Sequence, residues 1–223
     1  MDDPKTLVST DWLAAHLKGH DLTAVNSREA LAALSVLRKP ELMDAQTANP
    51  PFGGFANLEA LKGSRVFMSP GPIWEPQGLG ADPWGSGRSF FAAGFRPGDV
   101  VHCAISYHMT PGGWLLDEGL RAAGCTVFPA GTGNTEMQVE AAAALRPSAY
   151  AGTPDYLKIM LDKAGEMGKD LSSITRALVS GGALFPSMRD DYSARGVQVL
   201  QAYATADLGV IAYESALDGY LTE

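Results

Sequence analysis

The second two thirds of the chain alternate short apolar runs with longer helical patterns. Residues 100–105, for example, form an apolar run directly after a Pro-Gly-Asp break, and segments of about 10 to 15 residues with helical spacing separate such runs. This alternation is typical of βαβ units, because parallel strands have to be joined by a long crossover. The sequence therefore predicts an α/β fold with a parallel-rich sheet and flanking helices.

The boundaries of these elements follow from the turn residues between them. We expect strands within residues 65–69, 100–105, 125–131, 148–154 and 174–183, and a strand followed by a loop within 197–209. Helices are expected within residues 86–95, 111–124, 134–147, 154–168 and 185–196.

The residues before this region read as a helical lead-in. Between residues 5 and 45, Ser9, Thr10, Asn26 and Ser27 are N-cap candidates ahead of amphipathic stretches, and the Pro and Gly pairs of residues 50–54 mark a loop. We predict a helical lead-in over residues 1–60, packed on an α/β domain over residues 61–223.

Composition narrows the class of protein. A formal net charge of −8 with 46% hydrophobic residues suits a globular protein and argues against a nucleic-acid partner. No secretory leader and no apolar run of roughly 18 residues is evident, so we expect a cytoplasmic protein that does not bind a membrane. Cys103 and Cys125 lie in apolar surroundings and are expected to be buried free thiols.

Small residues mark the loops that follow the expected strands. The six loops read SPGPIWEPQG, SYHMTPGG, PAGTGNTE, AGTPDY, SGGALF and YATADLG. Gly, Ser and Thr let backbone N–H groups approach a ligand, and parallel sheets bind ligands beyond the carboxyl ends of their strands. Turns of α/β proteins need such residues in any case, so the pattern predicts a ligand cleft without naming the ligand.

The motifs PAGTGNTEMQ, AGTPDYL, SGGALFPSMR and QAYATADLGVIAYES together resemble the phenylacetate-CoA ligase family of adenylate-forming enzymes, over about residues 23–223. The resemblance implies the large N-terminal domain of that family. It also implies its chemistry: a carboxylic acid and ATP form an acyl-adenylate, and the acyl group then passes to coenzyme A, with Mg²⁺ neutralising phosphate charge. The small C-terminal domain, which carries the lysine that assists adenylation, is expected to be absent.

The same resemblance implies a nucleotide site. Gly181, Gly182 and Ala183 match the family's Gly-Ala-Glu-Pro segment, which borders the adenine, and Tyr203 matches its adenine-stacking tyrosine. At the end of that segment the family has Ser or Thr followed by Glu, where this chain has Ala206 and Asp207. The nucleotide-binding residues implied in this way are Gly181, Gly182, Ala183, Tyr203, Ala204, Thr205 and Asp207, with Asp207 also the candidate metal ligand.

Residues 67–78, FMSPGPIWEPQG, stand where the family has its phosphate loop. Ser69 and Gly71 match that loop, but Glu75 replaces the family's lysine, and each proline removes an N–H donor. A carboxylate at this position would repel a triphosphate. The sequence therefore predicts a degenerate phosphate loop.

The carboxylic acid is expected near residues 106–114. Tyr107 stands where the family has an aromatic residue ahead of a Gly-Gly helix start, so Tyr107 is the candidate pocket wall. His108 has no counterpart that assigns it a role, and a lone histidine here is more often structural. Trp114, Met109 and Tyr156 are further candidates for the pocket lining, although such residues are often ordinary core.

Two functions remain open. One is an acid-activating CoA ligase for an aryl or other carboxylic acid, truncated or impaired, whose catalytic residues are unknown. The other is a non-catalytic relative that binds a small acid, an acyl-CoA or a protein partner. Exposed apolar surface left by a missing domain would favour a homodimer. A weaker likeness of residues 7–22 to sulfurtransferases lacks the reactive cysteine of those enzymes.

Overall fold

The computed structural model describes residues 27–33, 36–56, 61–216 and 221–222. By contacts, the chain divides into two compact units, residues 1–80 and 81–223. The helix expected ahead of Asn26 lies outside the described residues. The domain boundary near residue 60 stays a prediction.

The described part of the first unit contains two helices and a hairpin. Its elements are α2 (Arg28–Ala32), α3 (Lys39–Ala48), β1 (Val66–Ser69) and β2 (Ile73–Pro76). The strands β1 and β2 pair antiparallel, so that Phe67 faces Glu75 and Ser69 faces Ile73. The sequence predicts β1 but not β2, and the second strand makes residues 66–76 a hairpin rather than a strand followed by an open loop.

The hairpin is held by a buried amide from α3. The Gln46 side chain accepts a hydrogen bond from the Trp74 N–H at 2.9 Å and donates its Nε2–H to the Trp74 carbonyl at 2.8 Å. In this way Gln46, which is only 6% exposed, takes the place of a neighbouring strand at the edge of β2.

The second unit alternates helices and strands along the chain. Its strands are β3 (Val100–Ala104), β4 (Thr126–Pro129), β5 (Ala149–Gly152), β6 (Arg176–Val179), β7 (Gln198–Thr205), β8 (Gly209–Glu214) and β9 (Leu221–Thr222). Its helices are α4 (Gly87–Ala92), α5 (Gly112–Ala122), α6 (Thr135–Leu145), α7 (Pro154–Met167) and α8 (Pro186–Ala194). Each of β3–β7 and α4–α8 lies within the range that the sequence predicts.

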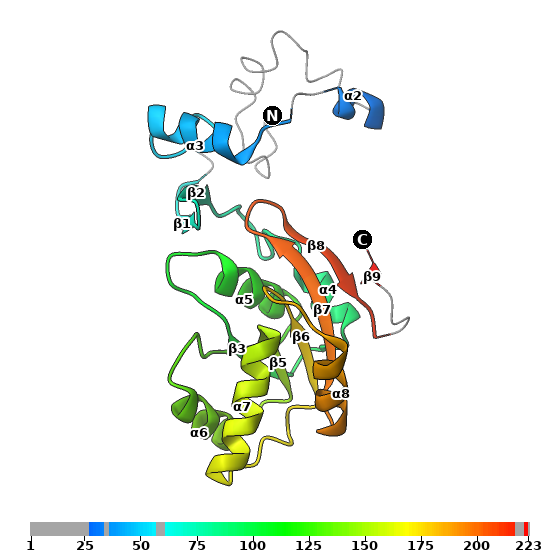
Figure 1. Ribbon diagram of the computed structural model, residues 1–223. Helices are drawn as coiled ribbons and strands as arrows, with labels where there is room; N and C mark the ends of the chain where they lie inside the picture. The colour runs from blue at the N-terminus through cyan, green and yellow to red at the C-terminus, as the bar shows by residue number, and fades with distance from the viewer. Residues whose placement is uncertain (1–26, 34–35, 57–60, 217–220, 223) are drawn as a thin grey trace. The chain divides into compact units, whose positions relative to one another are not determined.

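These strands form one mixed sheet in the order β4-β3-β5-β6-β7-β8-β9 (Figure 1). The pairs from β4 through β7 are parallel, whereas β8 and β9 are antiparallel additions. The prediction of an α/β fold with a parallel-rich sheet is confirmed. Because β3–β7 all run the same way, the loops that follow them leave from one edge of the sheet.

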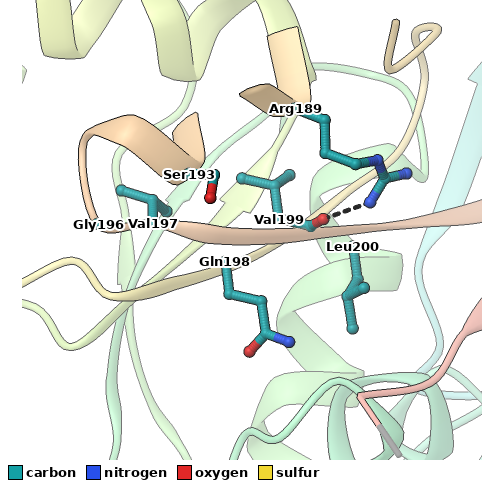
Figure 2. Close-up of a pocket in the computed structure, with 7 residues that line it drawn as sticks. All are labelled: Arg189, Ser193, Gly196, Val197, Gln198, Val199 and Leu200. Carbon is teal, nitrogen blue, oxygen red and sulfur yellow. Dashed lines mark hydrogen bonds between the residues drawn. The ribbon is translucent and has the colours of Figure 1, made fainter. Parts of the chain in front are cut away.

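Side chains make some of the backbone hydrogen bonds of β7 on the edge where β8 joins it. The Gln198 N–H bonds toward β6, so the peptide groups of Val199 and Gln201 point the other way. Arg189 of α8 donates to the Val199 carbonyl at 2.7 Å, as Figure 2 shows. Glu214 accepts from the Gln201 N–H at 2.9 Å and pairs with the Arg189 guanidinium at 2.9 and 3.1 Å. An ion pair therefore caps this part of the strand.

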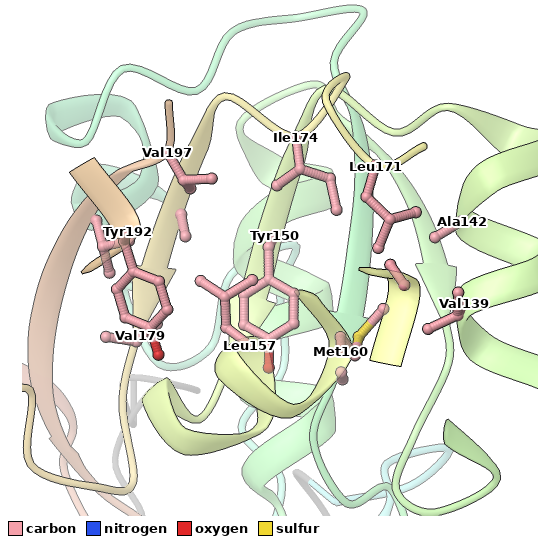
Figure 3. Close-up of a cluster of buried hydrophobic side chains, with 14 of the residues drawn as sticks. Val139, Ala142, Tyr150, Leu157, Met160, Leu171, Ile174, Val179, Tyr192 and Val197 are labelled. Carbon is pink, nitrogen blue, oxygen red and sulfur yellow. The ribbon is translucent and has the colours of Figure 1, made fainter. Parts of the chain in front are cut away.

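Two apolar clusters cover the two faces of the sheet. In β5, Tyr150 points to the cluster under α6, α7 and α8, and Ala149 and Ala151 point to the cluster under α4 and α5. Figure 3 shows the first cluster, in which the fully buried rings of Tyr150 and Tyr192 lie beside Leu157. The Tyr150 hydroxyl donates to the Thr153 carbonyl at 3.0 Å and the Tyr192 hydroxyl to the Pro154 carbonyl. Both tyrosines thus fix the loop that leads from β5 into α7.

Candidate functional site

Five of the six predicted loops lie together at the carboxyl edge of the sheet. They follow β3, β4, β5, β6 and β7, all of which are parallel. The sixth, residues 69–78, belongs to the hairpin of the first unit. Its expected place after a strand of the parallel sheet is therefore wrong, because it follows β1, which pairs only with β2 in the described part of the chain.

The loop after β6 exposes the residues predicted to border the adenine. Gly181 has a φ of +75°, which a residue with a side chain adopts only under strain, and Gly182 packs against Pro154 at the start of α7. Gly181, Gly182 and Ala183 are exposed, whereas Leu184 is buried. Leu184 thus anchors a loop whose preceding backbone faces solvent.

The end of β7 presents an aromatic ring next to that loop. Val179 of β6 pairs with Gln201, so Tyr203 lies two residues further along β7, at the level where the β6 loop begins. Tyr203 is 60% exposed and lies at a β-bulge. An exposed ring beside an open backbone segment can stack on a flat base.

The turn after Tyr203 carries the remaining predicted nucleotide residues. The Thr205 hydroxyl oxygen accepts a hydrogen bond from the Leu208 N–H at 3.2 Å, which leaves the hydroxyl hydrogen able to donate. Ala204, Thr205 and Asp207 are partly buried. Thr205 adjoins Ala206, where the family has Ser or Thr, and this geometry permits the Thr205 hydroxyl to take the place of the missing one.

Tyr107 in the loop after β3 is held firmly by helix α5. Its hydroxyl donates to Asp117 Oδ2 at 3.0 Å, and its ring meets Trp114 edge-on with 5.3 Å between the ring centroids. A Cβ on Gly113 would lie 2.7 Å from Tyr107 Cγ, which explains the glycine at that helix start. Burial raises the pKa of Tyr107, and the neighbouring Cys103 raises it further, so the phenol stays protonated.

The other candidates for the acid pocket behave differently. His108 and Met109 are exposed, and the His108 N–H donates to Ser106 Oγ at 3.2 Å. The Tyr156 hydroxyl donates to the Gly133 carbonyl at 3.1 Å. Tyr156 is thus tied to the loop after β4 rather than to Tyr107.

Sequence reasoning missed a buried pair that anchors the loop after β4. His102 is 0% exposed, and its Nε2 lies 2.9 Å from Gln138 Oε1. The Gln138 amide donates to the Gly133 carbonyl at 2.8 Å and, at longer range, to the carbonyls of Ala130 and Gly131. A histidine inside an apolar strand is the signal that would have pointed to it.

In the first unit, the predicted phosphate-loop residues bind one another. Ser69 is buried, and its hydroxyl donates to Glu75 Oε1 at 2.7 Å. Gly71 lies in the turn of the hairpin. The Ser69 hydroxyl, which would offer a donor to phosphate in a loop of the family's kind, is therefore already donated to a carboxylate.

Two cavities in the second unit are lined by none of the predicted site residues. One, of about 410 Å³, lies beside the start of β7 (Figure 2), and the other, of about 600 Å³, lies between α6 and α7. Arg189, Ser193, Gly196, Val197, Gln198, Val199 and Leu200 line the first. Asn134, Thr135, Glu136, Met137, Glu140, Lys163 and Met167 line the second.

The two cysteines are as the sequence predicts. Cys103 and Cys125 are free and buried, and burial raises the pKa of Cys103 to about 12 and that of Cys125 to about 11.

In the described ranges no group of three His, Cys, Asp or Glu side chains is close enough to hold a metal ion. No helix there has the length and apolar character needed to span a bilayer.

Comparison with known proteins gives the chain its relatives. It is 31% identical over 201 residues to a phenylacetate-coenzyme A ligase of Aromatoleum evansii, a match that covers 86% of this chain and 44% of the relative. It is 32% identical over 157 residues to the Pseudomonas putida enzyme of that name, covering 67% of this chain and 34% of the relative. The chain thus spans less than half the length of these curated relatives. No family model matches the sequence.

Solved structures agree on the fold. A 2-hydroxyisobutyryl-CoA ligase, crystallised in complex with 2-HIB-AMP and CoA, superposes with a TM-score of 0.79 at 22% identity over 94% of this chain and 50% of that chain. An anthranilate CoA ligase, in complex with anthranoyl-AMP, gives a TM-score of 0.54 at 16% identity over 69% of this chain and 31% of that chain. These structural likenesses show the fold alone. The sequence matches show that the chain belongs to the phenylacetate-CoA ligase family.

Proposed function

We propose that this chain binds the AMP moiety of an acyl-adenylate, together with an aryl or other apolar carboxylic acid, at the carboxyl edge of its sheet. One observation carries the proposal: neighbouring parallel strands expose the open backbone of residues 181–183 and the Tyr203 ring at the same level. Two structurally similar ligases, crystallised with 2-HIB-AMP and with anthranoyl-AMP, support it.

The reaction that we propose for this protein is that of its relatives. The acid carboxylate attacks the α-phosphorus of ATP and releases pyrophosphate, and the CoA thiol then displaces AMP from the acyl-adenylate. The residues described here would contribute to binding and orientation: Tyr203 beside the base, Thr205 as a hydroxyl donor and Tyr107 beside the acid.

We propose that Mg²⁺ would be bound by oxygens of the nucleotide phosphates as well as by this chain. Mg²⁺ is usually held by one or two carboxylates plus substrate phosphates, and Asp207 is the one carboxylate at the end of β7 that we propose for it. A single carboxylate with no cluster around it in the described residues fits only a shared site of this kind.

Calorimetry with AMP tests the nucleotide part of the proposal. Tyr203→Ala removes the stacking face, which is worth about 1–3 kcal/mol per base and corresponds to a roughly 5- to 150-fold weaker AMP affinity. Leu145→Ala is the control: Leu145 is likewise exposed but ends α6, at the opposite edge of the sheet. Equal AMP affinity in wild type and Tyr203→Ala would rule out the proposed base site.

The alternative, a relative that binds without catalysing, is favoured by the hairpin. Since Ser69 donates to Glu75, the segment matching the phosphate loop offers neither that donor nor a cation to a triphosphate. We therefore propose that ATP gains little over AMP. Glu75→Lys should strengthen ATP binding more than AMP binding, with Glu75→Met as the control for the lost hairpin bond.

An assay of pyrophosphate release with a panel of aryl acids separates the two functions. Turnover by this chain would exclude the binding-only alternative. Equal effects of Glu75→Lys on ATP and AMP would mean that residues 69–75 do not act on the phosphates.

A further inference from the structure

The side chain of Tyr107 is fixed at three points by helix α5. Trp114 donates its Nε1–H to the Tyr107 carbonyl at 3.3 Å and packs edge-on against the ring, Gly113 leaves space beneath the ring, and Asp117 accepts from the hydroxyl. The first two contacts fix the backbone and the plane of the ring. The third, together with the neighbouring Cys103 thiol, fixes where the hydroxyl points.

Asp117 is an unusual residue for its position. It is 9% exposed, and it belongs to the helix whose Leu116 and Leu120 pack in the apolar cluster under α4 and α5. A carboxylate in such a place is costly unless hydrogen bonds compensate for its lost water. The bond from the Tyr107 hydroxyl is one such compensation, so the buried carboxylate and the phenol stabilise each other.

The direction of the hydroxyl has a chemical consequence. Because it points to α5 and its hydrogen is given to Asp117, the polar end of Tyr107 is withdrawn from the loop edge. What remains on the loop side is ring carbon, beside Trp114. A wall of this kind suits an apolar or aryl group and offers no donor to a polar substituent.

We propose that Asp117 is a positioning residue for the acid-binding site: it holds the Tyr107 hydroxyl toward α5, so that the ring forms an apolar wall that selects aryl acids. This inference rests on the proposed function, since it takes Tyr107 to contact the acid. Asp117 acts through Tyr107 and does not itself touch the acid.

Calorimetry with phenylacetate and, separately, with AMP provides the test. Asp117→Leu removes the acceptor and is expected to weaken phenylacetate binding 5- to 20-fold, while the AMP affinity changes less than twofold. Asp117→Asn keeps an oxygen that can accept from the tyrosine and should recover most of the lost affinity. Asp162→Asn, which removes an ion-paired carboxylate of α7, is the matched control and should change neither affinity.

A double-mutant cycle reads whether Asp117 works through the hydroxyl. In a Tyr107→Phe background, Asp117→Leu should alter phenylacetate affinity less than twofold. If Asp117→Leu does not fold, Tyr107→Phe alone provides the test, with phenylacetate expected to bind 3- to 10-fold more weakly and AMP unchanged.

The outcomes separate the two claims. Unchanged phenylacetate affinity in Asp117→Leu, or in Tyr107→Phe, overturns the positioning role while the proposed function stands. Parallel losses of phenylacetate and AMP affinity also overturn it, because they indicate a general structural defect. Failure of the wild-type chain to bind phenylacetate overturns the acid-binding part of the proposed function and this inference with it.

Discussion

At the scale of single residues, His102 shows how a buried polar group can be committed to one protonation state. Gln138 gives its amide hydrogens to backbone carbonyls, so its oxygen faces His102, and His102 Nε2 must carry the shared hydrogen. The other ring nitrogen, Nδ1, is buried and has no hydrogen-bond partner among the described residues. Burial accordingly lowers the pKa of His102, although the bond to Gln138 opposes the shift.

The first prediction concerns stability against pH. With its folded-state pKa below the unfolded value of about 6.5, His102 binds a proton more readily in the unfolded chain. Stability is therefore full above pH 6.5 and falls as the pH drops below it, by at most about 1.4 kcal/mol per pH unit. Urea unfolding at pH 7.5 and 5.5 should show this loss in wild type and a smaller one in His102→Gln. His108→Gln, at an exposed histidine, should keep the wild-type loss, and an equal loss in all three would contradict the account.

The second prediction compares two helical glycines. Gly113→Ala places a Cβ within 2.7 Å of Tyr107 Cγ and 2.8 Å of the Ser106 carbonyl, so we expect about 1–3 kcal/mol of destabilisation from overpacking. Gly165→Ala in α7 meets nothing within 4 Å and should stabilise by about 0.5–1 kcal/mol through helix propensity. Thermal unfolding of the two variants should therefore shift in opposite directions. A shift of the same sign in both would show that Tyr107 yields to the added methyl.

At the scale of elements, the chain closes exposed strand backbone with side chains as well as with strands. Gln46 serves β2 in this way, and the Arg189–Glu214 pair serves β7. Both devices satisfy peptide groups that would otherwise be open to pairing with another chain. Neither is visible in the sequence, because each depends on a side chain meeting one specific peptide group of a distant segment.

The third prediction tests the β7 cap. Glu214→Gln keeps an oxygen for the Gln201 N–H but loses the charge opposite Arg189, whereas Glu214→Leu loses both. We expect about 0.5–1.5 kcal/mol of destabilisation for the first, and for the second about 1–3 kcal/mol more, which reflects the unpaired peptide and guanidinium. Chemical denaturation measures both, and equal stability of Glu214→Leu and wild type would contradict the capping role.

Strand prediction succeeded where turn residues bounded an apolar run and failed elsewhere. β3 follows a Pro-Gly-Asp break and consists of apolar residues apart from His102, so its position is plain. β2 contains Glu75 and Pro76, and its strand form depends on pairing with β1 and on Gln46. The sequence does not predict β8 (Gly209–Glu214), because β8 follows β7 after a short turn and residues 197–209 favour one strand that ends in a loop.

At the scale of the whole molecule, the sequence identifies the family and predicts that the loops share one edge of the sheet, since parallel strands bring their following loops to one side. It also predicts Gly181, Gly182, Ala183 and Tyr203 in two of the loops that follow expected strands, and the structure makes those two strands neighbours. The sequence does not predict which group accepts from the Tyr107 hydroxyl, because Asp117 becomes its acceptor only through the packing of α5 against β3. The bond between Ser69 and Glu75 likewise requires the register of the hairpin.

We expect this chain to bind AMP at the carboxyl edge of its sheet, and the β- and γ-phosphates of ATP to add little binding free energy. Parallel calorimetric titrations of AMP and ATP into the wild-type chain test it most directly. We expect saturable AMP binding and an ATP affinity no more than about threefold higher than that of AMP. A threefold difference in affinity corresponds to only about 0.7 kcal/mol of binding free energy. No AMP binding at millimolar concentration, or ATP bound tenfold or more tightly than AMP, would contradict it.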